Sequence, residues 1–245
     1  MADPIQAISA SMTALSKQYE VITHNIANAD TPGFKRRMTA FSQVLQDRMN
    51  GDGNTGADGA SLVSRASLDY SQGAIQQTGR TLDAAIQGDG FFTLETPEGE
   101  LYTRNGSFQV NERGHMVDTS GRTVAGESGP IIVPQNVSLQ ELVISRDGGV
   151  SVSGRPLGKL KISQFLPDQQ PLPIGRCLYV AKEDVQPKRD AENVTIHQGY
   201  RESSNVNVTE ELVALIKVAR MYEGNVKSYN AQDGRADTLM RVAMG

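Results

Sequence analysis

The two ends of this 245-residue chain carry the same hydrophobic pattern, in which apolar residues follow one another at alternating steps of three and four. Such spacing puts the apolar side chains on one stripe of an α-helix and is typical of helices that pack on helices. Near the C-terminal end, Asp233 is the one polar residue at a position where this pattern would place an apolar one. The predicted seam consists of Ile5, Ile8, Met12, Leu15, Tyr19, Ile22 and Ile26 in the first helix, and of Leu212, Leu215, Ala219, Tyr222, Val226 and Tyr229 in the second.

Residues that favour helix ends bound both patterns. Pro4 suits the first helical position, and Pro32-Gly33 ends a helix because proline lacks a backbone donor and disfavours helical geometry before it. We therefore predict a helix at about residues 4–28. Near the other end, Asn207 followed by Glu210 resembles a capping box, which predicts a helix at about residues 208–242.

Two matching stripes at opposite ends of one chain favour a pairing between them. A lone amphipathic helix would most simply bury its stripe against its own domain. Two seams with an unbroken alternation of three and four instead favour helix against helix, so we expect the terminal helices to pair as a coiled coil.

The face of the N-terminal helix opposite the seam carries little charge. In residues 1–29, only Asp3, Lys17 and Glu20 are charged, and Ser, Thr, Gln and Asn fill the rest of the polar face. A helix that faces water normally carries more charge. Our hypothesis is that this face, which includes Ser9 and Thr13, packs against neighbouring subunits, where uncharged polar groups avoid the desolvation cost of buried ions.

Between the helices, short β-like runs alternate with turn signals. Asn105-Gly106 is a strong hairpin signal, and Gly88-Asp89-Gly90 reads as a turn before a strand. The Gly-rich run at residues 50–60 predicts a flexible loop, and its weak likeness to a calcium loop fails at three required positions, which are one ligand, the obligatory glycine and the final glutamate. Strands are predicted at residues 91–95, 101–104, 108–110, 116–118, 122–125, 131–133, 142–144, 150–152, 157–165 and 178–180.

The predicted fold class is α+β, with the N- and C-terminal helices paired as a coiled coil and a central antiparallel β domain. We expect an N-terminal assembly helix at residues 1–30 and an extended segment with the Gly-rich loop at 31–80. The central β-rich domain follows at 81–200 and a C-terminal assembly helix at 201–245.

No pattern of catalytic, cofactor-binding or metal-binding residues occurs in the sequence, which favours a protein that is not an enzyme. His24, His115 and His197 lack the spacing of metal ligands, and Cys177 is the single cysteine. The net charge of −4 disfavours a nucleic-acid partner, and no apolar run is long enough to cross a membrane. The start of the chain lacks the basic and apolar regions of a secretory signal, so export would need another route.

Three ordered blocks together resemble one family, the bacterial flagellar rod and hook proteins. Residues 25–35 look like its N-terminal signature, residues 82–114 like its central block, and residues 198–233 like its C-terminal block. The motif residues are Asn25, Asn28, Thr31, Gly33 and Phe34 in the first block, Gly88, Gly90, Phe91, Phe92, Thr103, Arg104, Gly106 and Phe108 in the second, and Ser204, Asn205 and Val206 in the third.

This resemblance implies a structural subunit of the flagellar basal-body rod in the periplasm, most like the proximal rod protein. It implies export by the flagellar type III apparatus, without a cleaved signal peptide and without membrane insertion. The partners would be other copies and other rod proteins, with no cofactor and no small-molecule substrate. In the family the terminal helices pair to line the inner tube, and the rod transmits torque from motor to hook.

Two alternatives remain open on the sequence. The nearer one is a distal rod or hook-related axial paralogue, because the motifs overlap. The other is a secreted carbohydrate-binding or wall-binding β module, which would need an exposed aromatic platform or a carboxylate pair in a cleft. The low aromatic content of 5%, with no Trp, argues against such a platform.

Overall fold

A computed structural model describes residues 4–39, 67–183, 185–188 and 193–244, with side chains placed for 8–39, 67–183, 185–188 and 193–232. The predicted Gly-rich loop at residues 50–60 and the Ile5 side chain lie outside the described residues. The chain divides into a helical unit (Met1–Ala29, Arg36–Tyr70 and Val206–Gly245) and a β unit (Asp30–Lys35 and Ser71–Asn205). Helices and antiparallel strands in separate regions make this an α+β chain, as predicted.

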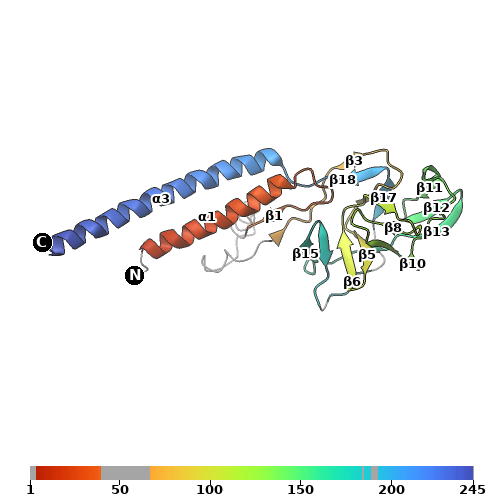
Figure 1. The fold of residues 1–245 in the computed structure, drawn as a ribbon, viewed down its shortest axis with the longest axis horizontal. Coiled ribbons are helices and arrows are strands. Elements are labelled where there is room, and N and C mark those ends of the chain that lie inside the picture. The colour runs from red at the N-terminus through yellow and green to blue at the C-terminus, as the bar shows by residue number, and fades with distance from the viewer. Residues whose placement is uncertain (1–3, 40–66, 184, 189–192, 245) are drawn as a thin grey trace. The chain divides into compact units, whose positions relative to one another are not determined.

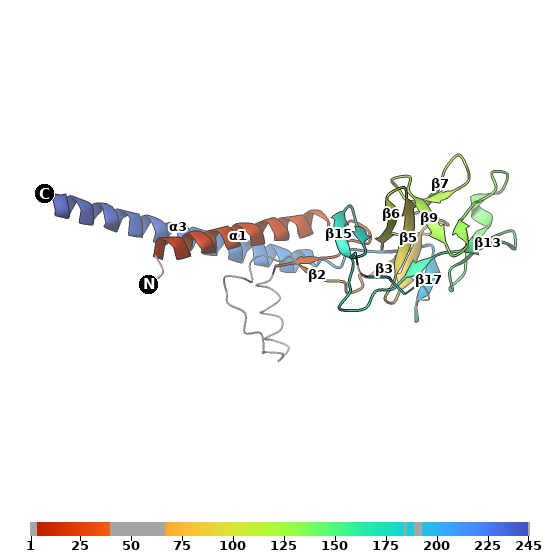
Figure 2. The same cartoon turned by 90° about the horizontal axis from the view of Figure 1, so that it is seen from below.

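The helical unit contains α1 (Pro4–Ala27), α3 (Val208–Met244) and a small ribbon of β1 (Arg37–Met38) with β2 (Ser67–Leu68). The helices lie side by side and antiparallel (Figure 1), and the second view agrees (Figure 2). α3 starts where the sequence predicts, because the Asn207 Oδ1 atom accepts from the Thr209 backbone N–H at 3.1 Å. The side chain of Asn207 also donates to Glu210 Oε1 at 2.9 Å, which satisfies the cap.

A small apolar cluster joins α1 to α3. Leu15 and Ile22 on α1 and Val218 on α3 are buried together, and Ile26, Ala214 and Leu215 pack against them. One polar contact accompanies this cluster, from Asn225 Nδ2 to Ser11 Oγ at 2.8 Å. Most other apolar residues of α3 with placed side chains stay exposed, so each helix buries only a narrow part of its surface within the unit.

The main sheet of the β unit is antiparallel and is built around β5 (Phe91–Thr96), which pairs with β6, β9 and β14. The path along this sheet runs β15-β16-β6-β5-β9-β8-β7, and β10 adds to β9. The further bounds are β6 (Gly99–Thr103), β7 (Gln109–Val110), β8 (Met116–Val117), β9 (Thr123–Gly126), β10 (Gly129–Pro130), β14 (Ile162–Ser163), β15 (Leu172–Gly175) and β16 (Leu178–Val180).

Three smaller sheets complete the β unit. A meander of β11 (Leu142–Ile144), β12 (Gly149–Val152) and β13 (Arg155–Lys159) follows a short 3-10 turn, η2 (Leu139–Glu141). Two ribbons join distant parts of the chain, because β17 (Thr195–Gln198) pairs with β4 (Ala84–Gln87), and β18 (Tyr200–Glu202) pairs with β3 (Ile75–Gln77). The predicted strand at residues 131–133 contributes only a single bridge, between Ile132 and His115.

The hairpin predicted at Asn105-Gly106 is wrong. β6 and β7 flank this dipeptide but pair with other strands, β6 with β5 and β16 and β7 with β8. Gly106 instead runs against the start of β4 (Ala84–Gln87), where its carbonyl accepts from the Ala84 N–H at 2.9 Å. A Cβ at Gly106 would lie 1.7 Å from the Ala84 carbonyl oxygen, so the glycine is needed for close backbone approach and not for a turn.

The core of the β unit is mainly aliphatic, with Leu, Ile and Val side chains from the main sheet and from the meander. Two fully buried rings lie within it, Phe92 and Phe108, whose centroids are 5.0 Å apart in an edge-to-face arrangement. Within the described residues, no helix combines the length and the apolar character that a membrane span requires.

Phe92→Ala is expected to lower the free energy of unfolding of the β unit by about 3–5 kcal/mol, because it opens a cavity where the ring packs on Phe108. Urea unfolding, followed by the near-UV circular dichroism of the tyrosines, measures the loss. Ile174→Ala removes an exposed side chain from the same unit and should change the stability by less than about 0.5 kcal/mol. Similar losses for both variants would contradict the assigned core.

Candidate functional site

Three charged side chains are buried together in the β unit. Lys35, Arg104 and Glu202 are only 1%, 3% and 1% exposed. Lys35 Nζ lies 2.7 Å from Glu202 Oε1, and Arg104 Nη1 lies 3.5 Å from Glu202 Oε2. We call these three residues the ionic cluster. One carboxylate therefore faces two cations, and the cluster needs further polar partners to offset the cost of removing three ions from water.

Backbone groups supply those partners. Lys35 Nζ donates to the Ser71 carbonyl at 2.6 Å, and the Gly73 N–H donates to Glu202 Oε1 at 3.0 Å. Arg104 Nη1 donates to the Gly88 carbonyl at 2.9 Å, and its guanidinium carbon lies 4.9 Å from the centre of the Phe91 ring. Burial lowers the pKa of Arg104, and the negative charge of Glu202 opposes that shift.

The ionic cluster draws together segments that are far apart in the sequence. Lys35 ends the N-terminal motif block, Arg104 belongs to the central block and Glu202 lies in the C-terminal block. Backbone contacts reinforce the junction, since a Cβ at Gly33 would lie 2.6 Å from the Asn105 nitrogen, and Gly33 has a φ of +68°. The Gly33 N–H also donates to the Glu202 carbonyl at 2.9 Å, so the main chains themselves are in contact.

The other motif residues in the β unit have structural positions that sequence reasoning alone did not assign. Phe34, Phe91, Phe92, Thr103 and Phe108 are buried. Thr103 Oγ1 donates to the Cys177 carbonyl at 2.9 Å, and Asn205 Nδ2 donates to Ser71 Oγ at 3.1 Å. Gly88 has a φ of +105°, and Gly90 is buried against Ile162, so both shape the turn before β5 as predicted. Thr31 and Ser204 are half-buried.

Motif residues of the helical unit hold the end of α1. Asn25 is buried, and its side chain makes two hydrogen bonds of 2.8 Å with the backbone of Arg37, one as donor and one as acceptor. Asn28 Nδ2 donates to the His24 carbonyl at 2.8 Å, which satisfies one of the free carbonyls at the helix end. Val206, before α3, is half-buried.

The predicted seam residues lie at different depths. On α1, Leu15 and Ile22 are buried and Ile8, Met12 and Ile26 are half-buried, whereas Tyr19 is 47% exposed. On α3, Leu215 and Val226 are half-buried, whereas Leu212, Ala219, Tyr222 and Tyr229 are exposed. The single unit therefore brings together part of the predicted seam and leaves the rest open, and the role of these residues in assembly stays a prediction.

Sequence reasoning missed the residues of α3 that lie closest to α1. Val218 is buried with Leu15 and Ile22 of α1, and Asn225 bonds to α1, so the inward face includes positions 218 and 225. Glu211, near the start of α3, is buried as well and forms an ion pair with Arg36 of the same unit. Val218 and Asn225 are not in the predicted seam, whereas Leu215, which is in it, packs against the apolar cluster.

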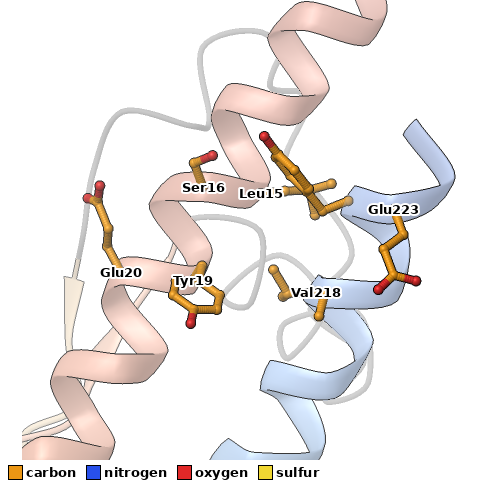
Figure 3. Close-up of a pocket in the computed structure, with 8 residues that line it drawn as sticks. Leu15, Ser16, Tyr19, Glu20, Val218 and Glu223 are labelled. Carbon is orange, nitrogen blue, oxygen red and sulfur yellow. The ribbon is translucent and has the colours of Figure 1, made fainter. Parts of the chain in front are cut away.

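An open groove lies between the helices beside the apolar cluster (Figure 3). Leu15 and Val218 face each other at its floor, and Tyr19 lies next to them. Its volume is about 410 Å³ and its exposed lining is mainly apolar. The groove is lined by Leu15, Ser16, Tyr19 and Glu20 from α1 and by Val218, Ala219, Tyr222 and Glu223 from α3.

Metal-binding chemistry is not assembled in the described residues, where no three His, Cys, Asp or Glu side chains gather closely enough to hold an ion. The two features that stand out in the described residues are the buried ionic cluster and the open apolar groove.

Three family models match this chain, and all describe flagellar axial proteins. They are the flagella basal body rod protein at residues 7–35, the flagellar hook protein FlgE/F/G D1 domain at 85–152, and the flagellar basal body rod FlgEFG protein C-terminal at 197–242. The matches cover parts of both helices and of the β unit.

Similar proteins of other bacteria extend over nearly the whole chain. The flagellar basal-body rod protein FlgG of Buchnera aphidicola subsp. Schizaphis graminum is 34% identical, over 97% of this chain and 100% of its own length. The rod proteins FlgF of Mesorhizobium japonicum and of Salmonella typhimurium are each 31% identical, over 96% and 97% of this chain and 95% and 99% of their own lengths.

The fold, the site and these relatives define a structural subunit of a flagellum and not an enzyme. The chain belongs to the flagellar basal-body rod protein family, and its place is in the basal body.

Glu202→Gln is expected to lower the free energy of unfolding by about 3–5 kcal/mol, because the neutral amide removes the buried carboxylate that faces both Lys35 and Arg104. Glu127→Gln is the matched control, since Glu127 pairs with Lys159 at 2.7 Å but both side chains are 44% exposed. That change should cost less than about 1 kcal/mol. Chemical denaturation of the two variants compares them, and equal costs would show that the cluster does not hold the β unit together.

Proposed function

We propose that this rod subunit polymerises through its terminal helices, which pair as a coiled coil inside the assembled rod. The contact of Leu15 and Ile22 with Val218 supports the pairing. The exposure of Tyr19, Tyr222 and Tyr229 is the observation that carries the proposal of polymerisation, because large apolar side chains left open on a helix pair mark a surface made for contact.

The outer face of α1 supports contact with further subunits. Ser9 and Thr13 are exposed there and Gln18, the third residue of the predicted face, is half-buried. Thr13 Oγ1 already donates to the Ser9 carbonyl at 3.0 Å within the helix. Small uncharged side chains allow close approach of a neighbouring helix and need no ion to be desolvated. We propose that this face packs on a neighbouring rod protein, either another copy or a related axial subunit.

Torque would pass through the subunit by contact alone. A packed interior resists deformation because any slip loses contacts over its whole area. In the β unit, the ionic cluster holds residues 30–35 and 202–205, and Lys35 also bonds to Ser71, so it contacts each of the segments that continue into the helical unit. A load that enters through one segment therefore meets a buried junction and not a free loop.

We place the subunit in the proximal part of the rod, as the FlgF type. The resemblance of the motif blocks supports this position, and length is neutral, because the alignments with FlgF of Mesorhizobium and of Salmonella span 238 and 267 positions for 96% and 97% of the chain. The alignment with Buchnera FlgG needs 265 positions for 97%, so that relative carries additional residues. A distal, FlgG-type position is the second candidate, favoured by the 34% identity with that relative.

We further propose that the flagellar type III apparatus exports the subunit to the periplasm without a cleaved signal peptide and without membrane insertion. In a strain whose flagellar export apparatus is inactive, the full-length subunit should stay in the cytoplasm. Arrival in the periplasm of that strain would contradict this route.

Ser9→Glu, Thr13→Glu and Gln18→Glu introduced together should abolish incorporation into basal bodies while leaving the isolated protein folded, because three carboxylates would have to be desolvated at the contact. The matched control introduces the same residue at exposed positions of the β unit, with Thr119→Glu, Ser128→Glu and Gln140→Glu. Immunoblots of purified basal bodies measure incorporation and circular dichroism measures folding. Normal incorporation of the first variant would count against the proposed face.

A strain without this subunit should be non-motile and should accumulate incomplete rods, and expression from a plasmid should restore swimming. Electron microscopy of basal bodies with a labelled subunit then distinguishes the two positions. Label next to the membrane-proximal end of the rod is expected, whereas label at the hook-proximal end would support the distal candidate. Normal swimming of the deletion strain would overturn the proposed function.

A further inference from the structure

Directional polar contacts join both helices of the helical unit to the same short stretch of chain. Asn25 of α1 is 1% exposed, and its side chain donates to and accepts from the backbone of Arg37 in β1, at 2.8 Å in each case. The preceding residue, Arg36, forms an ion pair with Glu211 of α3, whose side chain is also 1% exposed. We call Asn25, Arg36 and Glu211 the polar clamp. Through it, residues 36–37 link the end of α1 to the start of α3.

The apolar cluster between the helices does not by itself fix how far α3 is displaced along α1. Val218 packs with Leu15 and Ile22, but one turn to either side of Val218 the chain carries further apolar or aromatic residues, at positions 214, 215, 221 and 222. Apolar contacts have no preferred direction. A helix pair displaced by one turn, about 5.4 Å, would therefore still bury apolar surface.

The polar clamp, in contrast, fits a single register. One turn to either side of Glu211, positions 207, 208, 214 and 215 carry Asn, Val, Ala and Leu, none of which is acidic. A displacement of α3 by one turn would separate Glu211 from Arg36 and bring a neutral side chain beside the guanidinium. Fixing the register of paired elements is the best-attested role of buried polar and ionic groups.

A second polar contact agrees with the same register. Asn225 Nδ2 donates to Ser11 Oγ at 2.8 Å. Ser11 precedes Asn25 by 14 residues, and Asn225 follows Glu211 by 14 residues, so in an antiparallel pair both contacts occur at one relative displacement of the helices. Because 14 residues are close to four full turns, each helix presents the same face at both levels.

The helix dipole alone does not account for Glu211. An acidic side chain in the first turn of a helix is favoured on any face, and the exposed Glu210 already occupies such a position while bonding to Asn207. The dipole does not require a carboxylate to leave water, which is costly without a partner. The burial of Glu211 is instead explained by its ion pair with Arg36.

We propose that Asn25, Arg36 and Glu211 are positioning residues that set the register of α3 against α1 within one subunit. Asn25 holds the backbone at Arg37 against the end of α1, and Arg36 then selects Glu211 among the residues at the start of α3. The chosen register decides which side chains of the pair stay exposed, among them Tyr19 and Tyr222. This inference goes beyond the proposed polymerisation, because it concerns how a single subunit aligns its helices by itself.

Cysteine cross-linking within the purified full-length subunit measures the register. In a Cys177→Ser background, Ser11→Cys with Asn225→Cys reports the native register, because these two side chains are in contact. Ser11→Cys with Met221→Cys, and Ser11→Cys with Ser228→Cys, report displacements by one turn in either direction. Under mild oxidation at low protein concentration, the native pair should form at least about fivefold more intramolecular disulfide than either displaced pair.

Glu211→Leu and Asn25→Leu should each reduce this preference to below about twofold. Glu211→Leu makes position 211 resemble the apolar positions one turn away, and Asn25→Leu removes both bonds to Arg37 at similar volume. Glu210→Leu is the matched control, since it removes an exposed acid from the same first turn and should leave the preference unchanged. Far-UV circular dichroism of each variant checks that the helices form.

The ratio of native to displaced disulfides separates a role in register from a general effect on stability. A simple loss of stability lowers all three disulfides together, so an unchanged ratio in Glu211→Leu and Asn25→Leu would overturn the proposal. Failure of the pair at positions 11 and 225 to cross-link when the polar clamp is intact would overturn it as well. Neither result touches the proposed rod function, which is refuted only by normal swimming of the deletion strain.

Discussion

One buried carboxylate holds the β unit together. Glu202 faces Lys35 and Arg104, and it also accepts from the Gly73 backbone, so four segments of the chain meet at a single side chain. A buried ion is costly unless its partners surround it, and that cost makes the arrangement specific, since a misplaced strand would leave a charge unpaired. The glycines at positions 33, 73 and 106 permit the close main-chain contacts around this junction.

The helical unit differs from the β unit, because only part of its apolar surface is buried. A narrow cluster around Leu15 and Val218 joins the helices, whereas tyrosines and aliphatic side chains outside it remain open. For a protein that acts alone this would be a liability to aggregation. For a subunit of a polymer such exposure is a requirement, because apolar side chains that are exposed in the monomer can be buried against neighbouring subunits. The packed β unit thus maintains the shape of the chain, and the partly exposed helices offer surfaces for contact.

Family membership fits this division of tasks. The rod is a structural element, and the chain shows contact surfaces and packed junctions where an enzyme would show a cleft with catalytic groups. The motif residues of the three sequence blocks are largely explained by packing within one chain, because Phe92, Phe108, Thr103 and Arg104 are buried in the β unit. The exposed apolar groove at Tyr19 and Tyr222 lies outside these motifs.

The sequence by itself determined both helices, the capping of α3 at Asn207 and the antiparallel β region, because periodicity and turn residues are local signals. Its three motif blocks pointed to the family by their resemblance. Only the tertiary structure decided that Lys35, Arg104 and Glu202 meet, that Gly106 serves a close contact and not a hairpin, and that α3 turns Val218 and Asn225 toward α1. These features depend on residues up to about two hundred positions apart. A polar residue on a buried face looks like a solvent-exposed one until its partner is placed beside it, which is why the hydrophobic pattern did not point to Asn225.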